Sequence, residues 1–486
     1  MSSPNKPFAV RIQEKLAASR FFTFSALLHV VLVIMGGSVV LFKQYIEPPD
    51  FVSEGGGLLT AETMPQPPAE QPPDMTQQAF TPDQPTISAP TLDSITTTST
   101  APSFTMAAAP VRAMPSNVTA SLTNVAASMS KGIANSLPAS MGGRVGGSKA
   151  AMAKKVGGKE KSEKAVMAGL RWLKQNQNED GSWAGDYKPS MTGLAVLCFL
   201  GHGETPESPE FGPTVKKGLD WLLTRGTEFE GRLSLTKEGW GGENHGVYEH
   251  AIATYAMAEY YTMTKDERFA DILKLAVGHI VSGQAPDGGW KYRYGKGPNS
   301  DTSVSGWQIQ ALKAAHLSEL GMPGVDEALD KAMINLKRVQ TPDGNFHYEK
   351  PGDRGENPSL VGVGVLCSYF WKPARDKSVR DGIEYMLDRK HGELDYKGDK
   401  ADLYAWYYNT QAALMYGGSA WTKWNRMFQD QIADNQSDDG SWPPVAGKSG
   451  GGELQHKPDG AGPVYRTTLC ILMLEVFYRY MPTTKG

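Results

Sequence analysis

Gln284-Ala-Pro-Asp-Gly-Gly-Trp290 recurs in related form along the C-terminal two thirds of the chain. The other copies are Gln175-Asn-Gln-Asn-Glu-Asp-Gly-Ser-Trp183, Gln340-Thr-Pro-Asp-Gly-Asn-Phe346 and Asn435-Gln-Ser-Asp-Asp-Gly-Ser-Trp442, with degenerate copies at Gly239-Trp240 and His391-Gly392. The glycines of the six copies are 48 to 58 residues apart. A sustained period of this length is typical of repeat folds, in which one unit cannot bury its apolar face without its neighbours.

Each unit is expected to contain two helices, one on either side of the turn. The helix before the turn is amphipathic, as the helical spacing of Val166, Leu170 and Leu173 indicates. The helix after the turn is apolar on all sides, as in Thr192–Leu200, and this is typical of a buried helix. We therefore expect an outer ring of amphipathic helices around an inner ring of apolar helices.

The residues of the turn have separate predicted roles. Glycine accepts the left-handed backbone conformation that ends a helix, so the Asp-Gly pair is expected to terminate the first helix. The aromatic residue two positions later is expected to cover the junction between units. The glutamine is expected to hydrogen-bond exposed groups at a helix end.

The repeated Q-x-x-D-G-x-W pattern between paired helices resembles the repeats of squalene–hopene cyclases and protein prenyltransferase β-subunits. It is also similar to bacterial toroid proteins of the prenyltransferase and squalene oxidase repeat family, in the segments Val247–Glu259, Asp301–Gln308 and Asp402–Tyr408. The resemblance spans residues 160–482. It implies an all-α fold, an (α/α)6 toroid of six two-helix repeats with a central cavity, and we place this domain at residues 156–482.

The resemblance also allows the chemistry of these families to be checked. Class II cyclases protonate an alkene with the middle aspartate of a D-x-D-D-T-A motif, and Pro298-Asn-Ser-Asp301-Thr302-Ser303 retains only its end. Ser300 stands in the position of the proton donor, and a hydroxyl is too weak an acid for that step. No prenyltransferase zinc motif of Asp, Cys and His is visible, so we expect no metal and no cofactor.

Polar and aromatic residues on or near the predicted inner helices are the candidates for a site. If the chain is an enzyme, we expect its catalytic groups to be Asp301, His250 and Glu259. The expected ligand contacts are Trp307, Tyr404, Tyr408, Tyr465 and Arg466. The inner helices should run parallel, so their N-termini should form one mouth that favours anions.

Structural roles remain open for the same residues. Asp301 and Asp402 have the position of helix caps. His250 and the tyrosines have the composition of core residues, and Glu259 and Arg466 are placed to form an ion pair across the ring. The cysteines Cys198, Cys367 and Cys470 lie in apolar runs, which predicts buried thiols.

Residues 21–42 contain no Asp, Glu, Lys or Arg. A helix of this length spans roughly 33 Å, enough to cross the hydrocarbon core of a bilayer. Residues 1–20 are basic and are predicted to be cytoplasmic, because basic residues favour that side. We therefore expect a single-pass inner-membrane anchor, rather than a cleaved signal peptide, and a C-terminal domain in the periplasm or another extracytoplasmic space. Residues 43–155, rich in Pro, Ser, Thr and Ala, are expected to be a disordered tether.

The predicted span contains one ionisable residue, His29, with Ser25 one helical turn before it. This S-x3-H face resembles that of TonB-type energy transducers. The resemblance implies docking on an ExbB/ExbD-type proton-channel complex in the inner membrane. The alternative is an ordinary anchor that tolerates a neutral histidine.

Three functions follow from these patterns. The first is a membrane-tethered binding or scaffold module for an isoprenoid, a glycan or a peptide. The second is an enzyme with terpenoid cyclase-like, prenyltransferase-like or other lyase or transferase chemistry in the cavity, and the third, compatible with either, is a TonB-like energy-transducing component. The net charge of −3 argues against nucleic acid as a partner. Candidate side chains converging on an open pocket would favour the enzyme, and a pore filled with Tyr and Trp would exclude it.

Overall fold

The computed structural model describes residues 139–144, 148–235, 246–294, 300–350, 352–353, 358–371, 377–388, 394–446 and 452–479. Over these residues the chain forms helices and turns and no strand. The predicted span at 21–42, with Ser25 and His29, and most of the predicted tether lie outside them. Of the helices described, none is both long and apolar enough to cross a membrane.

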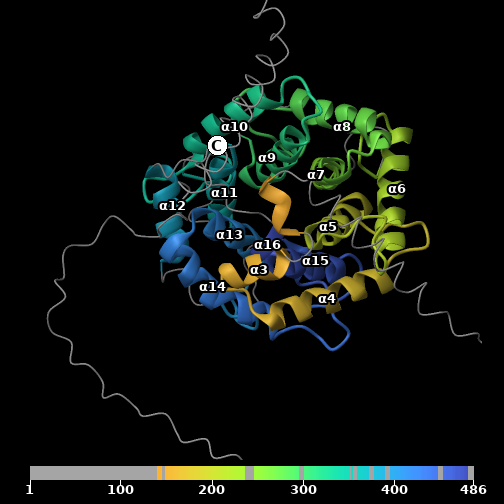
Figure 1. The fold of residues 1–486 in the computed structure, drawn as a ribbon. Helices are drawn as coiled ribbons and strands as arrows, with labels where there is room; N and C mark the ends of the chain where they lie inside the picture. The colour runs from red at the N-terminus through yellow and green to blue at the C-terminus, as the bar shows by residue number, and fades with distance from the viewer. Residues whose placement is uncertain are drawn as a thin grey trace, which may run out of the picture. The chain divides into compact units, whose positions relative to one another are not determined.

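Six helices, one from each repeat, form a closed inner ring (Figure 1). In chain order they are α5 (Lys188–His202), α7 (Gly246–Thr264), α9 (Thr302–Leu317), α11 (Val361–Trp371), α13 (Leu403–Tyr416) and α15 (Gly462–Leu474). Each inner helix packs against the next, and α15 packs against α5, so the ring closes. Most of their residues are buried, as their apolar composition predicted.

Six further helices form the outer ring. They are α4 (Glu160–Gln175), α6 (Gly212–Glu228), α8 (Ala270–Ser282), α10 (Val325–Val339), α12 (Lys377–Leu387) and α14 (Gly418–Ala433). Each lies against two neighbouring inner helices, and α14 of the last repeat also contacts α4 of the first. The fold is an all-α (α/α)6 toroid. The three cysteines are buried and free, as expected.

In three of the four described turns, the tryptophan caps the end of the outer helix before it. Indole Nε1 donates to a backbone carbonyl ten residues earlier: Trp183 to Leu173 at 2.7 Å, Trp290 to Ile280 at 2.8 Å and Trp442 to Ile432 at 2.7 Å. These carbonyls lie in the last turns of α4, α8 and α14, where no helical N–H remains to pair with them. The three tryptophans are wholly buried, so the expected covering of the junctions is confirmed.

In the four described turns, a glutamine binds the next outer helix. The side-chain amide donates from Gln177 to the Thr214 carbonyl at 3.0 Å, from Gln284 to Ala328 at 2.7 Å, and from Gln436 to Ala165 at 2.8 Å. The last of these contacts joins the sixth repeat to the first. In the first copy the glutamine that acts is therefore Gln177 and not Gln175, with which the quoted segment starts.

The glycines of the turns do not end helices, so that prediction was wrong. Helix α4 ends at Gln175, well before Gly181. The four described turn glycines have positive φ, and a Cβ on any of them would lie 2.2 to 2.4 Å from a backbone oxygen of the next outer helix: Gly181, Gly288, Gly344 and Gly440. Glycine is needed here because the turn and the helix backbone lie in direct contact.

The helical domain begins earlier than residue 156, where we expected it. η1 (Ala139–Arg144) and α3 (Ser148–Lys155) precede α4 and pack against the short helix α16 (Val476–Arg479). Figure 1 shows this segment, in orange, over the middle of the ring. The side chains of Met141 and Arg144 are buried. Residues 139–144 and 148–155 therefore pack with the toroid, where we expected a disordered tether.

Candidate functional site

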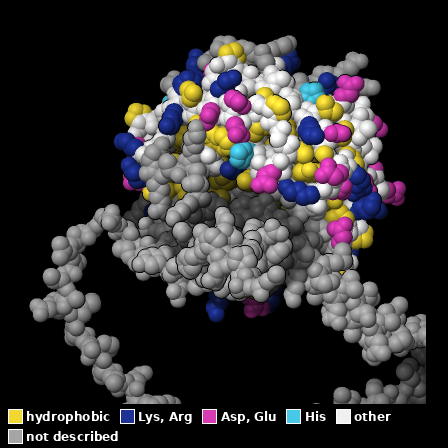
Figure 2. Space-filling view, turned by 45° about the horizontal axis from the view of Figure 1, so that its top comes forward, with side chains coloured by type: hydrophobic (Ala, Val, Ile, Leu, Met, Phe, Trp, Pro, Cys, Tyr) yellow, Lys and Arg dark blue, Asp and Glu magenta, His cyan; other side chains and the backbone are white. Residues whose placement is uncertain are grey.

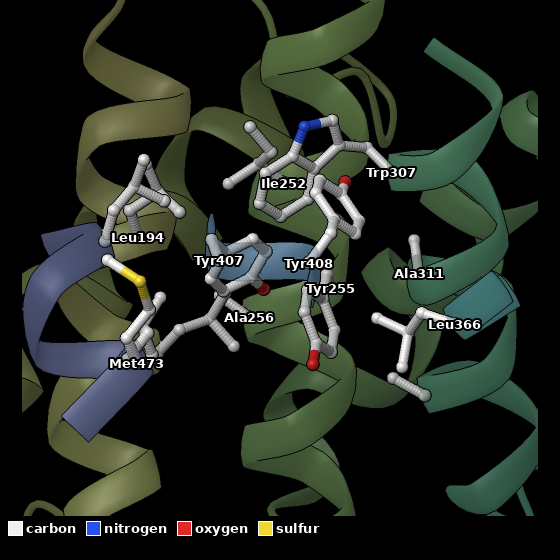
Figure 3. Close-up of a cluster of buried hydrophobic side chains, with 14 of the residues drawn as sticks. Leu194, Ile252, Tyr255, Ala256, Trp307, Ala311, Leu366, Tyr407, Tyr408 and Met473 are labelled. Atoms are coloured by element: carbon white, nitrogen blue, oxygen red, sulfur yellow. The ribbon is translucent and has the colours of Figure 1, made fainter. Parts of the chain in front are cut away.

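The centre of the inner ring is filled by side chains. Trp307 of α9 stacks on Tyr407 of α13 with ring centroids 5.5 Å apart, and Tyr408 meets the same indole edge-on at 5.6 Å. Figure 3 shows these rings with Tyr255 below Tyr408 in this view and apolar side chains of neighbouring inner helices around them. Trp307 and Tyr408, which we expected to contact a ligand, are 2% and 0% exposed and belong to the core. The middle of the ring is thus packed core, where the resemblance implied a cavity.

The N-terminal ends of the inner helices meet at one mouth of the ring, here called the N-terminal mouth. The hydroxyl oxygens of Tyr248, at the start of α7, and Ser303, at the start of α9, are 2.5 Å apart. Tyr404, at the start of α13, donates to the Ser303 carbonyl at 3.4 Å. Ser359, just before α11, donates to Asp402, just before α13, at 2.5 Å. The expected gathering of N-termini is confirmed by these contacts.

Asp301 is the N-cap of α9. Its Oδ1 accepts from the backbone N–H groups of Ser303 and Val304, at 2.8 and 3.0 Å, and from the Ser303 hydroxyl at 2.5 Å. The side chain is 1% exposed, and burial raises the pKa of the Asp301 carboxyl against the lowering effect of these hydrogen bonds. The structural alternative of a cap is thus correct, and the cap also lies in the mouth.

Four tyrosines surround Asp301, and together with it they are called the tyrosine cluster: Tyr248, Tyr292, Tyr348 and Tyr404. The hydroxyl oxygens of Tyr292 and Tyr348 are 2.5 Å apart, and the rings of Tyr248 and Tyr292 are 5.6 Å apart. Burial raises the pKa of Tyr248, Tyr292 and Tyr348, and the Asp301 carboxylate raises each of them further. These three side chains remain partly exposed, so the cluster presents aromatic surface to the mouth, while their hydroxyl groups hydrogen-bond to Ser303 or to one another.

Two further carboxyl groups lie at the N-terminal mouth. Asp402 caps α13, accepting from the Ala405 N–H at 3.0 Å, and burial raises the pKa of its carboxyl. Burial, and then the Asp402 carboxylate, raises the pKa of the partly exposed Tyr465 of α15. Glu249 of α7 is 3% exposed, and its Oε2 has no hydrogen-bond partner among the described residues. Burial raises the pKa of Glu249 to about 8.

At α9 and α13 the structure does not support the expectation that this mouth favours anions. Asp301 and Asp402 take the first backbone N–H groups of α9 and α13, the groups that would otherwise bind an anion. Their carboxyl groups also add acidic character to the mouth. The arrangement favours a ligand that donates hydrogen bonds.

The structure does not bring His250 and Glu259 together with Asp301. His250 is wholly buried, with Nδ1 accepting from the Leu233 N–H at 3.1 Å and Nε2 donating to the Ala276 carbonyl at 2.9 Å. Burial lowers its pKa to about 3, so the ring is neutral and holds the backbone. Glu259 lies near the other end of α7 and pairs with arginines outside the N-terminal mouth.

Arg466 also has a structural role. Its Nε donates to the Trp442 carbonyl at 3.0 Å, and its Nη1 donates to the carbonyls of Leu454, at 3.3 Å, and Lys457. The guanidinium therefore fixes the segment that leads into α15. The expected ion pair with Glu259 was wrong, because Glu259 binds Arg144 and Arg479.

Sequence reasoning missed four members of the site, Tyr248, Ser303, Tyr292 and Tyr348. The last two each follow the aromatic residue of a turn by two positions, and this shared spacing is the signal that could have found them. The Thr302 N–H donates to the Tyr348 carbonyl at 2.8 Å, which brings the turn of the next repeat against the start of α9. Within the described residues, no group of three or more His, Cys, Asp or Glu side chains is arranged to hold a metal ion.

The outer wall of the ring contains none of the candidate residues. A surface hollow of about 800 Å³ between α12 and α14 is lined by side chains such as Arg380, Glu384, Tyr385 and Lys423. On the face shown in Figure 2, basic and acidic side chains are interspersed. Such mixing is typical of a solvated wall and offers no one-sign patch for a charged partner.

No protein-family model matches the chain, and no curated protein matches its sequence. Solved structures with a similar backbone include the GH76A α-1,6-mannanase of Salegentibacter sp. HEL1_6, at 12% identity over 65% of this chain and 98% of that chain, with a TM-score of 0.47. The type II terpene cyclase MstE from Scytonema is 13% identical over 65% of this chain and 98% of that chain, with a TM-score of 0.43. Cellobiose 2-epimerase from Spirochaeta thermophila is 13% identical over 75% of this chain and 99% of that chain, with a TM-score of 0.45. These TM-scores are below 0.5, so the likenesses assign neither a family nor an activity to this chain.

Proposed function

We propose that this protein is a membrane-tethered binding module whose toroid lies outside the cytoplasm. Its anchor is the predicted inner-membrane span at residues 21–42, and its ligand site is the N-terminal mouth. The ligand class is a neutral glycan.

The observation that carries this proposal is the tyrosine cluster at the mouth of a ring whose centre is filled. Among the residues that the structure describes, the packed centre leaves no deep apolar channel for an isoprenoid chain. Tyrosine rings offer an apolar face beside a hydroxyl, which suits the alternating C–H and O–H groups of a sugar. The buried carboxyl groups of Asp301 and Asp402 beside them favour a hydroxyl-rich ligand that donates hydrogen bonds, because they accept hydrogen bonds and repel anions.

The test measures binding of the full chain, in detergent micelles, to an array of neutral oligosaccharides. Tyr292→Ala and Tyr348→Ala should each weaken retention by about tenfold or more, because aromatic anchors dominate such contacts. Tyr261→Phe, near the opposite end of α7, is the matched control and should bind as the parent does. An array that retains none of the chains, or losses shared by the control, would refute the glycan site.

The centre filled by Trp307, Tyr407 and Tyr408 meets the condition that excludes an enzyme acting in a central cavity. A second candidate function is therefore glycan hydrolysis outside the centre, at the N-terminal mouth. The observation that favours it is that Asp301, Asp402 and Glu249 all have carboxyl pKa values raised by burial. Glycosidases combine a protonated carboxylic acid with an ionised carboxylate. Glu249→Gln and Asp301→Asn should abolish release of reducing ends while glycan retention persists. If the parent chain retains a glycan and releases no product, the protein only binds.

Cyclisation of the squalene type is not proposed. Ser300, in the position of the cyclase acid, is buried and donates to the carboxylate of Asp287. A hydroxyl in this arrangement cannot protonate an alkene.

The Ser25 and His29 face is proposed to dock on a proton-channel complex of the ExbB/ExbD type. What supports this is the resemblance to TonB-type transducers. The full chain and His29→Ala should be purified from native membranes and compared. Channel subunits should accompany only the parent chain, and equal recovery with both chains would show an ordinary anchor.

A further inference from the structure

The segment that precedes the repeats covers the second mouth of the ring, at the C-terminal ends of the inner helices. Arg144 of η1 is 1% exposed, and its Nη1 lies 2.9 Å from Oε2 of Glu259. Its Nε donates to the carbonyl of Arg479 at 2.9 Å, and its Nη1 also donates to the carbonyl of Leu200 at 3.4 Å. A guanidinium from outside the six repeats is therefore buried in this C-terminal mouth.

The charges in the C-terminal mouth leave Glu259 paired with or without Arg144. Nη2 of Arg479 lies 3.2 Å from Oε1 of Glu259, so the two arginines use different oxygens of one carboxylate. Removing the only cation from a buried pair would leave an uncompensated charge in the interior. Here the departure of Arg144 leaves the Glu259–Arg479 pair in place, so the mouth can accept and release a second guanidinium.

The segment is attached to the ring through few side chains. Glycines allow its backbone to lie close: a Cβ on Gly143 would be 2.5 Å from the Tyr478 carbonyl oxygen, and one on Gly203 would be 2.3 Å from that of Arg144. Helix α3 buries none of its residues. Its Lys149 lies 2.7 Å from Nε2 of His202 at the end of α5. Apolar surface that opposes detachment comes from Met141, which is buried in the core, and from Met152 and Ala153, which are only partly buried against it.

We propose that the C-terminal mouth is a second binding site, which takes an arginine-bearing peptide segment, and that η1 and α3 occupy it as a detachable intramolecular ligand. The contacts of this segment are separate from the turn contacts that close the ring, so it can leave while the repeats stay folded. Residues 139–155 connect the repeats to residues 1–138. If the anchor of the proposed function holds, a pull from the membrane reaches Arg144 before it reaches any repeat.

The first test is native-state hydrogen exchange of the full chain, read by mass spectrometry. Amides of residues 139–155 should exchange through a local opening that leaves α5, α7 and α15 protected, because weakly attached segments open independently. Exchange of the segment in step with these helices would overturn the proposal, since the segment would then be an integral part of the ring.

The second test compares Arg144→Ala with Lys154→Ala, an exposed position in the same segment, in the full chain. Arg144→Ala should speed exchange of residues 139–155 by about tenfold or more, with the inner helices unchanged, and Lys154→Ala should have no effect. Arg144→Lys keeps the charge but not the planar fork and should give an intermediate rate. Loss of inner-helix protection in both Arg144 variants would overturn the proposal.

A labelled peptide of residues 139–155 tests the site in trans. It should bind the Arg144→Ala chain at least about tenfold more tightly than the same peptide carrying Arg144→Ala, because only the first can pair with Glu259. Equal binding of the two peptides, or no binding of either, would overturn the assignment of a guanidinium site. Glycan retention at the N-terminal mouth is a separate readout, so failure here does not decide the proposed function.

Discussion

Gly440→Ala perturbs the contact by which the last repeat meets the first. Gly440 has φ +93°, and a Cβ there would lie 2.4 Å from the backbone oxygen of Ala168 in α4. The positive φ alone disfavours alanine by about 1–2 kcal/mol. Moving the turn away from α4 to relieve the close contact costs about 1–3 kcal/mol more, as in other overpacked sites. We expect the free energy of unfolding to fall by about 2–5 kcal/mol, measured by urea unfolding of the full chain followed by tryptophan fluorescence.

Two other glycines give this experiment its controls. Gly352 has φ +86° and no heavy atom within 4 Å of a Cβ, so Gly352→Ala should show only the backbone cost of about 1–2 kcal/mol. Gly344→Ala places a Cβ 2.2 Å from the Asp381 oxygen at a junction inside the ring and should cost as much as Gly440→Ala. Equal losses for Gly440→Ala and Gly352→Ala would show that the last turn does not touch α4, and the reasoning would be refuted.

Three further predictions concern buried polar groups. Trp290→Phe removes the donor to the Ile280 carbonyl and should lower the free energy of unfolding by about 1–3 kcal/mol, whereas an unchanged urea midpoint would exclude the capping role. His250 has a folded pKa of about 3, below its ordinary value, so below about pH 6.5 the unfolded state binds more protons than the folded state. As pH falls below about 6.5, the stability advantage of the parent over His250→Gln should therefore shrink by about 1.4 kcal/mol per pH unit, and an advantage that stays constant with pH would contradict the prediction. Burial raises the pKa of Glu475 to about 8, so the folded state holds a proton that the unfolded state releases above about pH 4.5. In urea unfolding, Glu475→Gln should therefore gain stability relative to the parent as pH rises from 5 to 8, by at most about 1.4 kcal/mol per pH unit, and the same pH dependence of stability in both chains would contradict the prediction.

The ring could be predicted from the sequence because the turn residues make the same local contact in several repeats. Trp183, Trp290 and Trp442 each bond to a carbonyl ten residues earlier, so sequence spacing alone encodes the contact. The apolar composition of the inner helices likewise reports burial on all sides. The role of the glycines was misjudged because it depends on a contact with the next outer helix. That helix is separated from the turn in the sequence by an inner helix, so local spacing does not reveal the contact.

The site was only partly predictable because its members meet through tertiary contacts. Asp301 could be found, since a helix cap is a local feature. Its neighbours Tyr248 and Tyr404 come from other repeats, and nothing in their local sequence distinguishes a mouth tyrosine from the core residue Tyr408. Glu259 was misassigned because its partner Arg144 lies in a segment whose composition predicts disorder.

The filled centre has a consequence for function. Trp307 and Tyr407 separate the two mouths with packed core, so ligands at the two ends of the ring do not compete for one cavity. The N-terminal mouth carries tyrosines and carboxyl groups, and the C-terminal mouth carries a buried Arg–Glu–Arg group. Each mouth can therefore be tested by variants that leave the other unchanged.

Carbodiimide cross-linking of the monomeric full chain tests ring closure most directly. Lys159 Nζ lies 2.6 Å from Asp430 Oδ1, and Lys161 Nζ lies 2.9 Å from Asp434 Oδ2, although each pair is separated by more than 270 residues and remains partly exposed. A closed ring predicts zero-length links between α4 and α14 within single chains, alongside the local link between Lys164 and Glu160, which are 2.7 Å apart. The local link without the long-range ones would contradict the closed ring.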